Sequence, residues 1–96
     1  MKKPPRAGTT PRPRLSLCMI VRDEEEALDR CLAAAAPFVD EIVVVDTGSR
    51  DRSREIARLR GARVLETPWT DDFSAARNVS LDAATGDWIV VLDADE

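Results

Sequence analysis

Two aspartates near the end of the chain, Asp93 and Asp95, have the residue type and spacing of a site for a hard divalent cation. They follow the apolar run 88–92, which is typical of a buried strand. A turn directly after that strand could direct both carboxylates at one ion. Mg²⁺ and Mn²⁺ prefer carboxylate and phosphate oxygens, so an ion held here could bridge to a diphosphate.

Further polar residues stand where other apolar runs end. Arg22 and Asp23 follow the run 15–21, and Asp46 ends the run 41–46. Taken singly, each is more often a helix cap or a turn residue than a ligand-binding residue. Because the carboxyl ends of parallel strands meet at one edge of a sheet, their convergence with Asp93 favours a binding site there.

An expected alternation of strands and helices positions these residues. Runs rich in apolar and β-branched residues predict strands, and apolar residues at helical spacing predict the helices between them. The strands are expected over 15–21, 41–46, 63–65 and 88–92, and the helices over 23–36, 51–60 and 73–84. This order predicts a doubly wound α/β fold with a mostly parallel sheet, four strands and three helices.

Local signals predict the starts and the inward faces of the helices. Asp23, with Glu26 three residues later, predicts a capping box for the first helix, and Asp51 predicts the cap of the second. Trp69 and Trp88 favour packing over stacking on a ligand. The arginines at 50, 52, 54, 58 and 60 favour a solvated helix face. The residues expected to face inward are Ala27, Leu28, Cys31, Leu32, Ala35, Ile56, Leu59, Phe73, Ala76, Val79 and Ala83.

Composition indicates one small domain preceded by a tail. Residues 1–14 hold five basic residues, four prolines and no acid, which predicts a disordered tail before a domain at 15–96. The domain has nine basic against 18 acidic residues, a net charge of −9, which argues against nucleic-acid binding. No apolar run reaches the roughly 18 residues of a membrane span, and no signal peptide is present. We therefore expect a cytoplasmic protein, with contact of the basic tail to a membrane surface as an alternative.

Several enzyme classes lack their characteristic residues. No Gly-x-Gly-x-x-Gly follows the first strand and no Walker loop is present, which excludes the usual dinucleotide and P-loop sites. The chain contains no histidine, so Ser-His and Cys-His nucleophiles are excluded within it. Cys18 and Cys31 have no Cys-x-x-Cys spacing, and we interpret both as small core residues.

Four motifs, in order, resemble those of the inverting family 2 glycosyltransferases, and the likeness extends over about residues 15–96. The stretch 69–78 looks closest to a bacterial branch of cell-wall and glycan synthesis. The motifs are Met-Ile-Val-Arg-Asp-Glu-Glu-Glu at 19–26, Val-Val-Asp-Thr-Gly-Ser-Arg-Asp at 44–51, Asp-Phe-Ser-Ala-Ala-Arg-Asn at 72–78 and Thr-Gly-Asp-Trp-Ile-Val-Val-Leu-Asp-Ala-Asp at 85–95.

The resemblance implies a GT-A fold and a nucleotide-diphosphate sugar donor, usually a UDP-sugar. The acceptor would be an unknown glycan, lipid or protein. At the matching positions, Asp46 would accept a hydrogen bond from the uracil ring. The loop of Arg22 and Asp23 would lie against the nucleoside, and Arg77 would reach the base or the diphosphate.

The resemblance also implies a divalent metal, Mg²⁺ or Mn²⁺. Asp93 would approach the ribose and the metal, and Asp95 would be its direct ligand. The metal would neutralise charge that grows on the diphosphate as the glycosyl bond breaks.

Two departures from the family pattern bear on activity. Family members often carry Asn where Asp23 stands, and their catalytic base lies well downstream, beyond the position of Glu96. We therefore expect this 96-residue chain to hold the donor without turning it over. The alternative is a catalytically incomplete nucleotide-binding module or an inert fragment.

Overall fold

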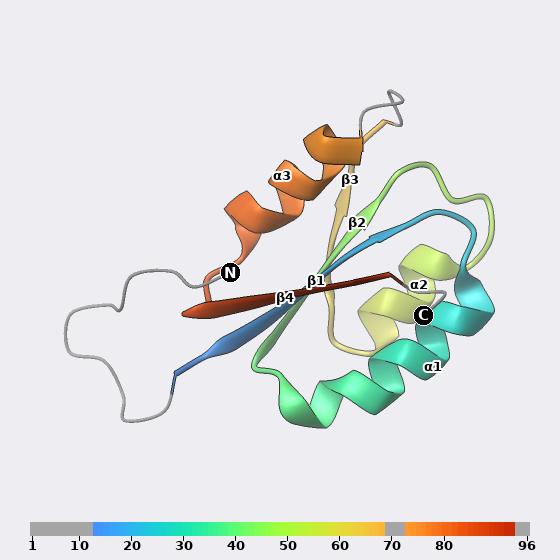
Figure 1. Cartoon of the computed structure of the whole chain (residues 1–96). Coiled ribbons are helices and arrows are strands. Elements are labelled where there is room, and N and C mark those ends of the chain that lie inside the picture. Colours follow the sequence, from blue (N-terminus) through green and yellow to red (C-terminus); the bar gives the residue numbers. More distant parts are fainter. Residues whose placement is uncertain (1–12, 69–72, 94–96) are drawn as a thin grey trace.

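The structure, a computed structural model, describes residues 13–68 and 73–93. Strands and helices alternate along this part of the chain, as predicted (Figure 1). The elements are β1 (Leu15–Val21), α1 (Glu25–Ala35), the 3₁₀ turn η1 (Ala36–Phe38), β2 (Glu41–Asp46), α2 (Ser53–Leu59), β3 (Arg63–Glu66), α3 (Phe73–Ala83) and β4 (Trp88–Asp93).

The four strands form one parallel sheet in the order β3-β2-β1-β4. The chain runs outward from β1 through β2 to β3, and then returns to place β4 on the other side of β1. Strand order thus reverses between β1 and β4, and ligands of such folds bind beyond the carboxyl ends of the strands near that reversal. The predicted α/β fold with four strands and three helices is confirmed.

Helices cover both faces of the sheet. Figure 1 shows α1 and α2 on one face and α3 on the other. Alternate β1 residues supply the two cores, because successive strand side chains point to opposite faces. Leu17 and Met19 pack with Leu28 and Leu32 of α1, whereas Cys18 packs with Ala84, which directly follows α3.

Most of the predicted inward faces are confirmed. All five apolar residues predicted for α1 belong to its core, and Cys18 and Cys31 are free thiols packed in the two cores. In α3, Ala76 is buried, and the polar Ser80 is buried beside it. The side chain of Phe73, and Trp69 as a whole, lie outside the described residues.

One predicted inward residue is exposed instead. Leu59 is 79% exposed, because α2 spans only two turns and directs Ser53 and Ala57, four residues apart, toward the sheet. Trp88, expected to pack and not to stack on a ligand, is 43% exposed on β4, which pairs with β1 alone among the described strands. The predicted solvated face of arginines is confirmed, since Arg52, Arg54, Arg58 and Arg60 all form exposed ion pairs.

A hydrogen-bonded junction fixes β4 beside β1 at the amino-terminal edge of the sheet. Ser16 Oγ and Thr85 N both donate to Glu41 Oε1, at 2.7 and 2.8 Å, and Gly86 N donates to Ser16 Oγ at 2.8 Å. A Cβ atom at Gly86 would lie 2.5 Å from Ser16 Oγ and 2.9 Å from Ser16 N, so only glycine fits. The junction sets the register that carries Asp93 to the opposite edge.

No helix in the described parts of the chain is long and apolar enough to cross a membrane. Residues 1–12 of the predicted tail lie outside the described part, so its disorder stays a prediction.

Candidate donor site at the carboxyl edge of the sheet

Three of the predicted site residues lie at the carboxyl ends of adjacent strands. Asp46, the last residue of β2, is paired with Val21, the last residue of β1, and Arg22 follows at once. Asp93 ends β4 and is paired with Ile20, one residue earlier on β1. Neighbouring strands lie about 4.8 Å apart, so the backbones of Asp46 and Asp93 are separated by roughly 10 Å across β1. This separation suits the two ends of an extended ligand better than two ligands of one ion.

Asp46 is the most buried of these residues, and its two carboxylate oxygens differ. Its side chain is 1% exposed. Oδ1 accepts hydrogen bonds from the amides of Gly48 and Ser49, both at 2.9 Å. Oδ2 is buried and accepts no hydrogen bond from the described residues. An unsatisfied buried acceptor costs about 1–3 kcal/mol, so an oxygen of this kind is a candidate for a ligand contact.

The loop after Asp46 leaves room for a ligand. Gly48 has a φ of +110°, a conformation that L side chains rarely adopt, and a Cβ atom there would meet nothing within 4 Å. Thr47 N and Thr47 Oγ1 both donate to Val21 O, at 3.0 and 3.1 Å. The loop is therefore joined to the end of β1 and open above Gly48.

Reciprocal hydrogen bonds connect the loops after β1 and β2. Ser49 Oγ accepts from Asp23 N at 3.0 Å. In return, Asp23 Oδ1 accepts from Arg50 N at 2.6 Å and from Asp51 N at 3.3 Å. The two loops thus form one hydrogen-bonded unit beside Asp46.

The predicted capping box at Asp23 is wrong. Asp23 has a φ of +52°, α1 begins two residues later at Glu25, and its N-cap, Glu24, makes no side-chain cap. The left-handed turn at Asp23 aims its carboxylate at the neighbouring loop instead of at α1.

The first turn of α1 is bonded by the loop that precedes α2. Asp51 Oδ2 accepts from Glu25 N at 3.1 Å, and Ser53 Oγ accepts from Glu24 N at 3.0 Å. Glu25 Oε2 in turn accepts from Arg52 N at 3.2 Å. Each loop therefore satisfies amides at the start of the other loop's helix.

Asp51 lies one residue before the N-cap of α2, Arg52, where the sequence predicted Asp51 itself as the cap. Its Oδ1 accepts from the amide and the hydroxyl of Ser53, at 2.9 and 2.7 Å. Desolvation alone would raise the pKa of Asp51, but the hydrogen bonds from Ser53 and Glu25 outweigh it and lower the pKa. These hydrogen bonds therefore favour the ionised carboxylate of Asp51.

Arg77 lies on the other face of the sheet. Cys18 Sγ contacts the Ser80 carbonyl oxygen at 3.6 Å, which places the second half of α3 over the middle of β1. Arg77 is three residues earlier, about 4.5 Å nearer the start of α3, and its side chain is exposed. The role of Arg77 toward a ligand stays a prediction.

The predicted metal ligands lie outside what the structure describes. The structure does not describe Asp95 or the side chain of Asp93, and it places only the backbone of Asp93. Among the described residues, no group of three or more His, Cys, Asp or Glu side chains could hold a metal ion. The carboxylate chemistry of Asp93 and Asp95 fits a hard divalent cation.

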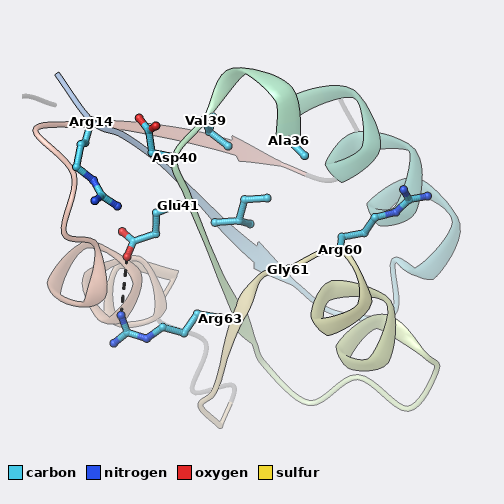
Figure 2. A pocket seen from close by; sticks show the side chains of 9 residues that line it. Arg14, Ala36, Val39, Asp40, Glu41, Arg60, Gly61 and Arg63 are labelled. Atoms are coloured by element: carbon cyan, nitrogen blue, oxygen red, sulfur yellow. Dashed lines mark ion pairs between the residues drawn. The ribbon is translucent and has the colours of Figure 1, made fainter. Parts of the chain in front are cut away.

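A hollow of about 360 Å³ lies at the opposite, amino-terminal edge of the sheet. Figure 2 shows Glu41 and Arg63 facing each other across it, with a closest distance of 4.0 Å. Asp40 accepts a hydrogen bond from Leu15 N, and Arg60 pairs with Asp29. These polar groups hold the fold together, and none of the predicted site residues lines this hollow.

Sequence reasoning missed the loop-connecting roles of Ser49, Asp51 and Ser53. The available signal was the cluster of small polar residues that follows Asp46, because serine and aspartate bond nearby backbone amides. Their partners in the loop after β1 depend on the parallel pairing of β1 with β2, which a local pattern does not contain.

Comparison with known proteins identifies the family. Residues 16–96 match the family described as Glycosyl transferase family 2. The chain belongs to this family. The resemblance noted in the sequence is thus confirmed.

Two relatives and one solved structure illustrate the likeness. The chain is 65% identical over 83 residues to a TPR repeat-containing protein of Synechococcus elongatus, a match that covers 86% of the chain and 21% of that protein. It is 32% identical over 85 residues to the SPbeta prophage-derived glycosyltransferase SunS of Bacillus subtilis, covering 86% and 20%. The chain thus spans about a fifth of each relative.

The solved structure is glucosyl-3-phosphoglycerate synthase from Mycobacterium tuberculosis in complex with Mn²⁺, uridine diphosphate and glucosyl-3-phosphoglycerate. It is similar with a TM-score of 0.75 and 27% sequence identity, and the match covers 93% of this chain and 39% of that one.

Proposed function

We propose that this chain forms the donor-binding part of an inverting glycosyltransferase, which holds a UDP-sugar through a divalent metal. The observation that carries the proposal is the buried free oxygen of Asp46 at the carboxyl edge of the sheet. The uracil ring carries an N–H that could donate to this oxygen. Membership of the family and a neighbour in complex with Mn²⁺ and uridine diphosphate support the same assignment.

We assign the residues along the edge in the order of an extended donor. Asp46 accepts a hydrogen bond from uracil, and the loop of Arg22 and Asp23 lies against the nucleoside. Asp93, roughly two strand spacings from Asp46, approaches the ribose and the metal. Arg77 approaches the base or the diphosphate from α3.

Asp95, with Asp93, would hold Mg²⁺ or Mn²⁺. When bound, the ion neutralises charge on the diphosphate leaving group. The protein residues bind and orient the donor, and the described residues provide no group that we assign as catalytic base. The first candidate is therefore the donor-binding part of a glycosyltransferase, and the second is a catalytically incomplete nucleotide-binding module or an inert fragment.

Calorimetry with UDP and Mn²⁺ tests the binding proposal. We expect the unaltered chain to bind UDP only when the metal is present, and Asp95→Ala to abolish the metal-dependent heat. Asp82→Ala, which removes an exposed carboxylate on α3, is the matched control and should bind as the unaltered chain does. A folded, unaltered chain that gives no heat with UDP and Mn²⁺ would contradict the proposal.

A donor-hydrolysis or glycosyl-transfer assay tests whether this chain turns the donor over by itself. We expect binding without release of UDP from a UDP-sugar, a result that agrees with a donor-binding part and with a nucleotide-binding module alike. Release of UDP by the chain, lost in Asp95→Ala, supports a complete transferase.

A further inference from the structure

We propose that Asp23 is a positioning residue that orients Asp46, a role that rests on the function proposed above. Its Oδ1 atom accepts hydrogen bonds from two amides of the neighbouring loop, Arg50 N at 2.6 Å and Asp51 N at 3.3 Å. Its backbone adopts a φ of +52°, and it is the one non-glycine residue with positive φ in the described chain. A non-glycine residue in this region is uncommon, and its cost is tolerated where surrounding contacts determine the conformation.

A short hydrogen-bonded path leads from Asp23 to Asp46. The Asp23 amide donates to Ser49 Oγ at 3.0 Å, and the Ser49 amide donates to Asp46 Oδ1 at 2.9 Å. The backbone and the side chain of Asp23 thus hold residues 49–51 from two directions. If these bonds are lost, Ser49 is released, and the Asp46 carboxylate loses one of the two donors that fix it.

The orientation of Asp46 determines where its free oxygen points. Oδ1 is fixed by Gly48 N and Ser49 N, and Oδ2 is then directed by the planar geometry of the carboxylate. A rotation of this group would move Oδ2 away from a donor on a bound base. Asp23 would therefore influence nucleotide affinity without touching the nucleotide through its own carboxylate.

The contacts define what position 23 requires. One acceptor oxygen and tolerance of the left-handed conformation are needed, whereas a negative charge is not. Asparagine supplies an Oδ1 acceptor and adopts positive φ more readily than most residues. Glycine supplies the backbone conformation without the acceptor, and alanine supplies neither.

Three substitutions separate these requirements. We measure the Kd for UDP with Mn²⁺ by calorimetry for the unaltered chain, Asp23→Asn, Asp23→Gly and Asp23→Ala, with Asp82→Ala as control. Asp23→Asn should stay within about threefold of the unaltered chain, whereas Asp23→Gly and Asp23→Ala should weaken binding by about tenfold or more, because two hydrogen bonds to the loop are lost. Amide hydrogen exchange of Arg50 and Asp51 without ligand should accelerate in Asp23→Gly and not in Asp23→Asn.

The outcomes distinguish this inference from the proposed function. If the unaltered chain binds UDP and Asp23→Asn is as weak as Asp23→Ala, the charge itself is needed and the positioning role is wrong. Full affinity in Asp23→Gly would also overturn it. If the unaltered chain does not bind UDP, the proposed function is wrong. The positioning role, which depends on that function, is then wrong as well, whatever the exchange rates are. Equal exchange rates in Asp23→Gly and the unaltered chain would show that the side chain does not hold the loop.

Discussion

The two oxygens of the Asp46 carboxylate have different environments. Oδ1 accepts hydrogen bonds from two loop amides, and Oδ2 is buried and accepts no hydrogen bond from the described residues. Leaving a buried acceptor without a hydrogen bond is costly, so a ligand that donates to this oxygen would bind favourably here. Asp46 is therefore the residue on which base recognition would depend.

Asp46→Asn tests whether this oxygen reads the base. Asparagine keeps Oδ1 for the loop amides but presents an N–H donor where Oδ2 stood. Uracil carries a donor at N3 and cytosine an acceptor, so two donors would meet in the UDP complex. We expect UDP binding to weaken by about tenfold or more, and the preference for UDP over CDP to narrow.

The measurement is calorimetry with UDP and with CDP at a fixed Mn²⁺ concentration. Asp82→Asn makes the same chemical change on the exposed surface of α3 and serves as the control. Equal losses for UDP and CDP would mean that Asp46 supports the loop and does not read the base.

At the scale of elements, the sequence predicted those features that depend on local periodicity. The apolar spacing in α1 identified its buried face, because residues three and four apart lie on one side of a helix. Leu59 was predicted wrongly, since its exposure depends on the length of α2. The crossed bonds between the two loops likewise required the pairing of β1 with β2.

The junction of Glu41 with Thr85 and Ser16 holds β4 in register, and its strength should depend on pH. Partial burial would raise the pKa of Glu41, but hydrogen bonds from Thr85 and Ser16 and the charge of Arg63 outweigh it and lower the pKa. A carboxylate with a lowered folded-state pKa stabilises the fold above its ordinary value of 4.5, and the contribution is lost as the pH falls through the lower folded value.

Glu41→Gln should therefore lower the free energy of unfolding by about 1–2 kcal/mol at neutral pH, because the negative charge that strengthens the hydrogen bonds from Ser16 and Thr85 is removed. The difference from the unaltered chain should shrink at pH values well below 4.5, where the carboxylate is protonated in both states. Urea unfolding, followed by circular dichroism at neutral pH and at a pH well below 4.5, measures this difference in the free energy of unfolding. Glu26→Gln, at an exposed position on α1, controls for the loss of a surface carboxylate. A difference that does not change with pH would contradict this account of Glu41.

At the scale of the whole molecule, the fold and the convergence of the candidate site residues on one sheet edge could be predicted from the sequence. Alternating strands and helices imply a parallel sheet, and a parallel sheet brings Arg22, Asp46 and Asp93 to one edge. The free oxygen of Asp46 could not be predicted, because it depends on how the following loop satisfies Oδ1. The metal-binding part of the site lies with Asp95, outside the described residues, and stays a prediction.

The two edges of the sheet are two different candidate locations for a bound nucleotide. At the carboxyl edge, Asp46 Oδ2 lies buried without a hydrogen bond from the described residues, near the point where strand order reverses between β1 and β4. The amino edge holds the hollow of Figure 2, whose Glu41 and Arg60 are engaged with other side chains. Nucleotide binding at the amino edge would place the ligand about a strand length from the predicted site residues, since Glu41 and Asp46 are the two ends of β2.

A titration of the ¹⁵N-labelled chain with UDP and Mg²⁺, followed by amide chemical shifts, tests the central claim most directly. The account predicts that the largest shifts arise in Arg22 and Asp23, in residues 46–49 and in Asp93. Shifts confined to Asp40, Arg60 and Gly61, around the amino-edge hollow, would contradict it.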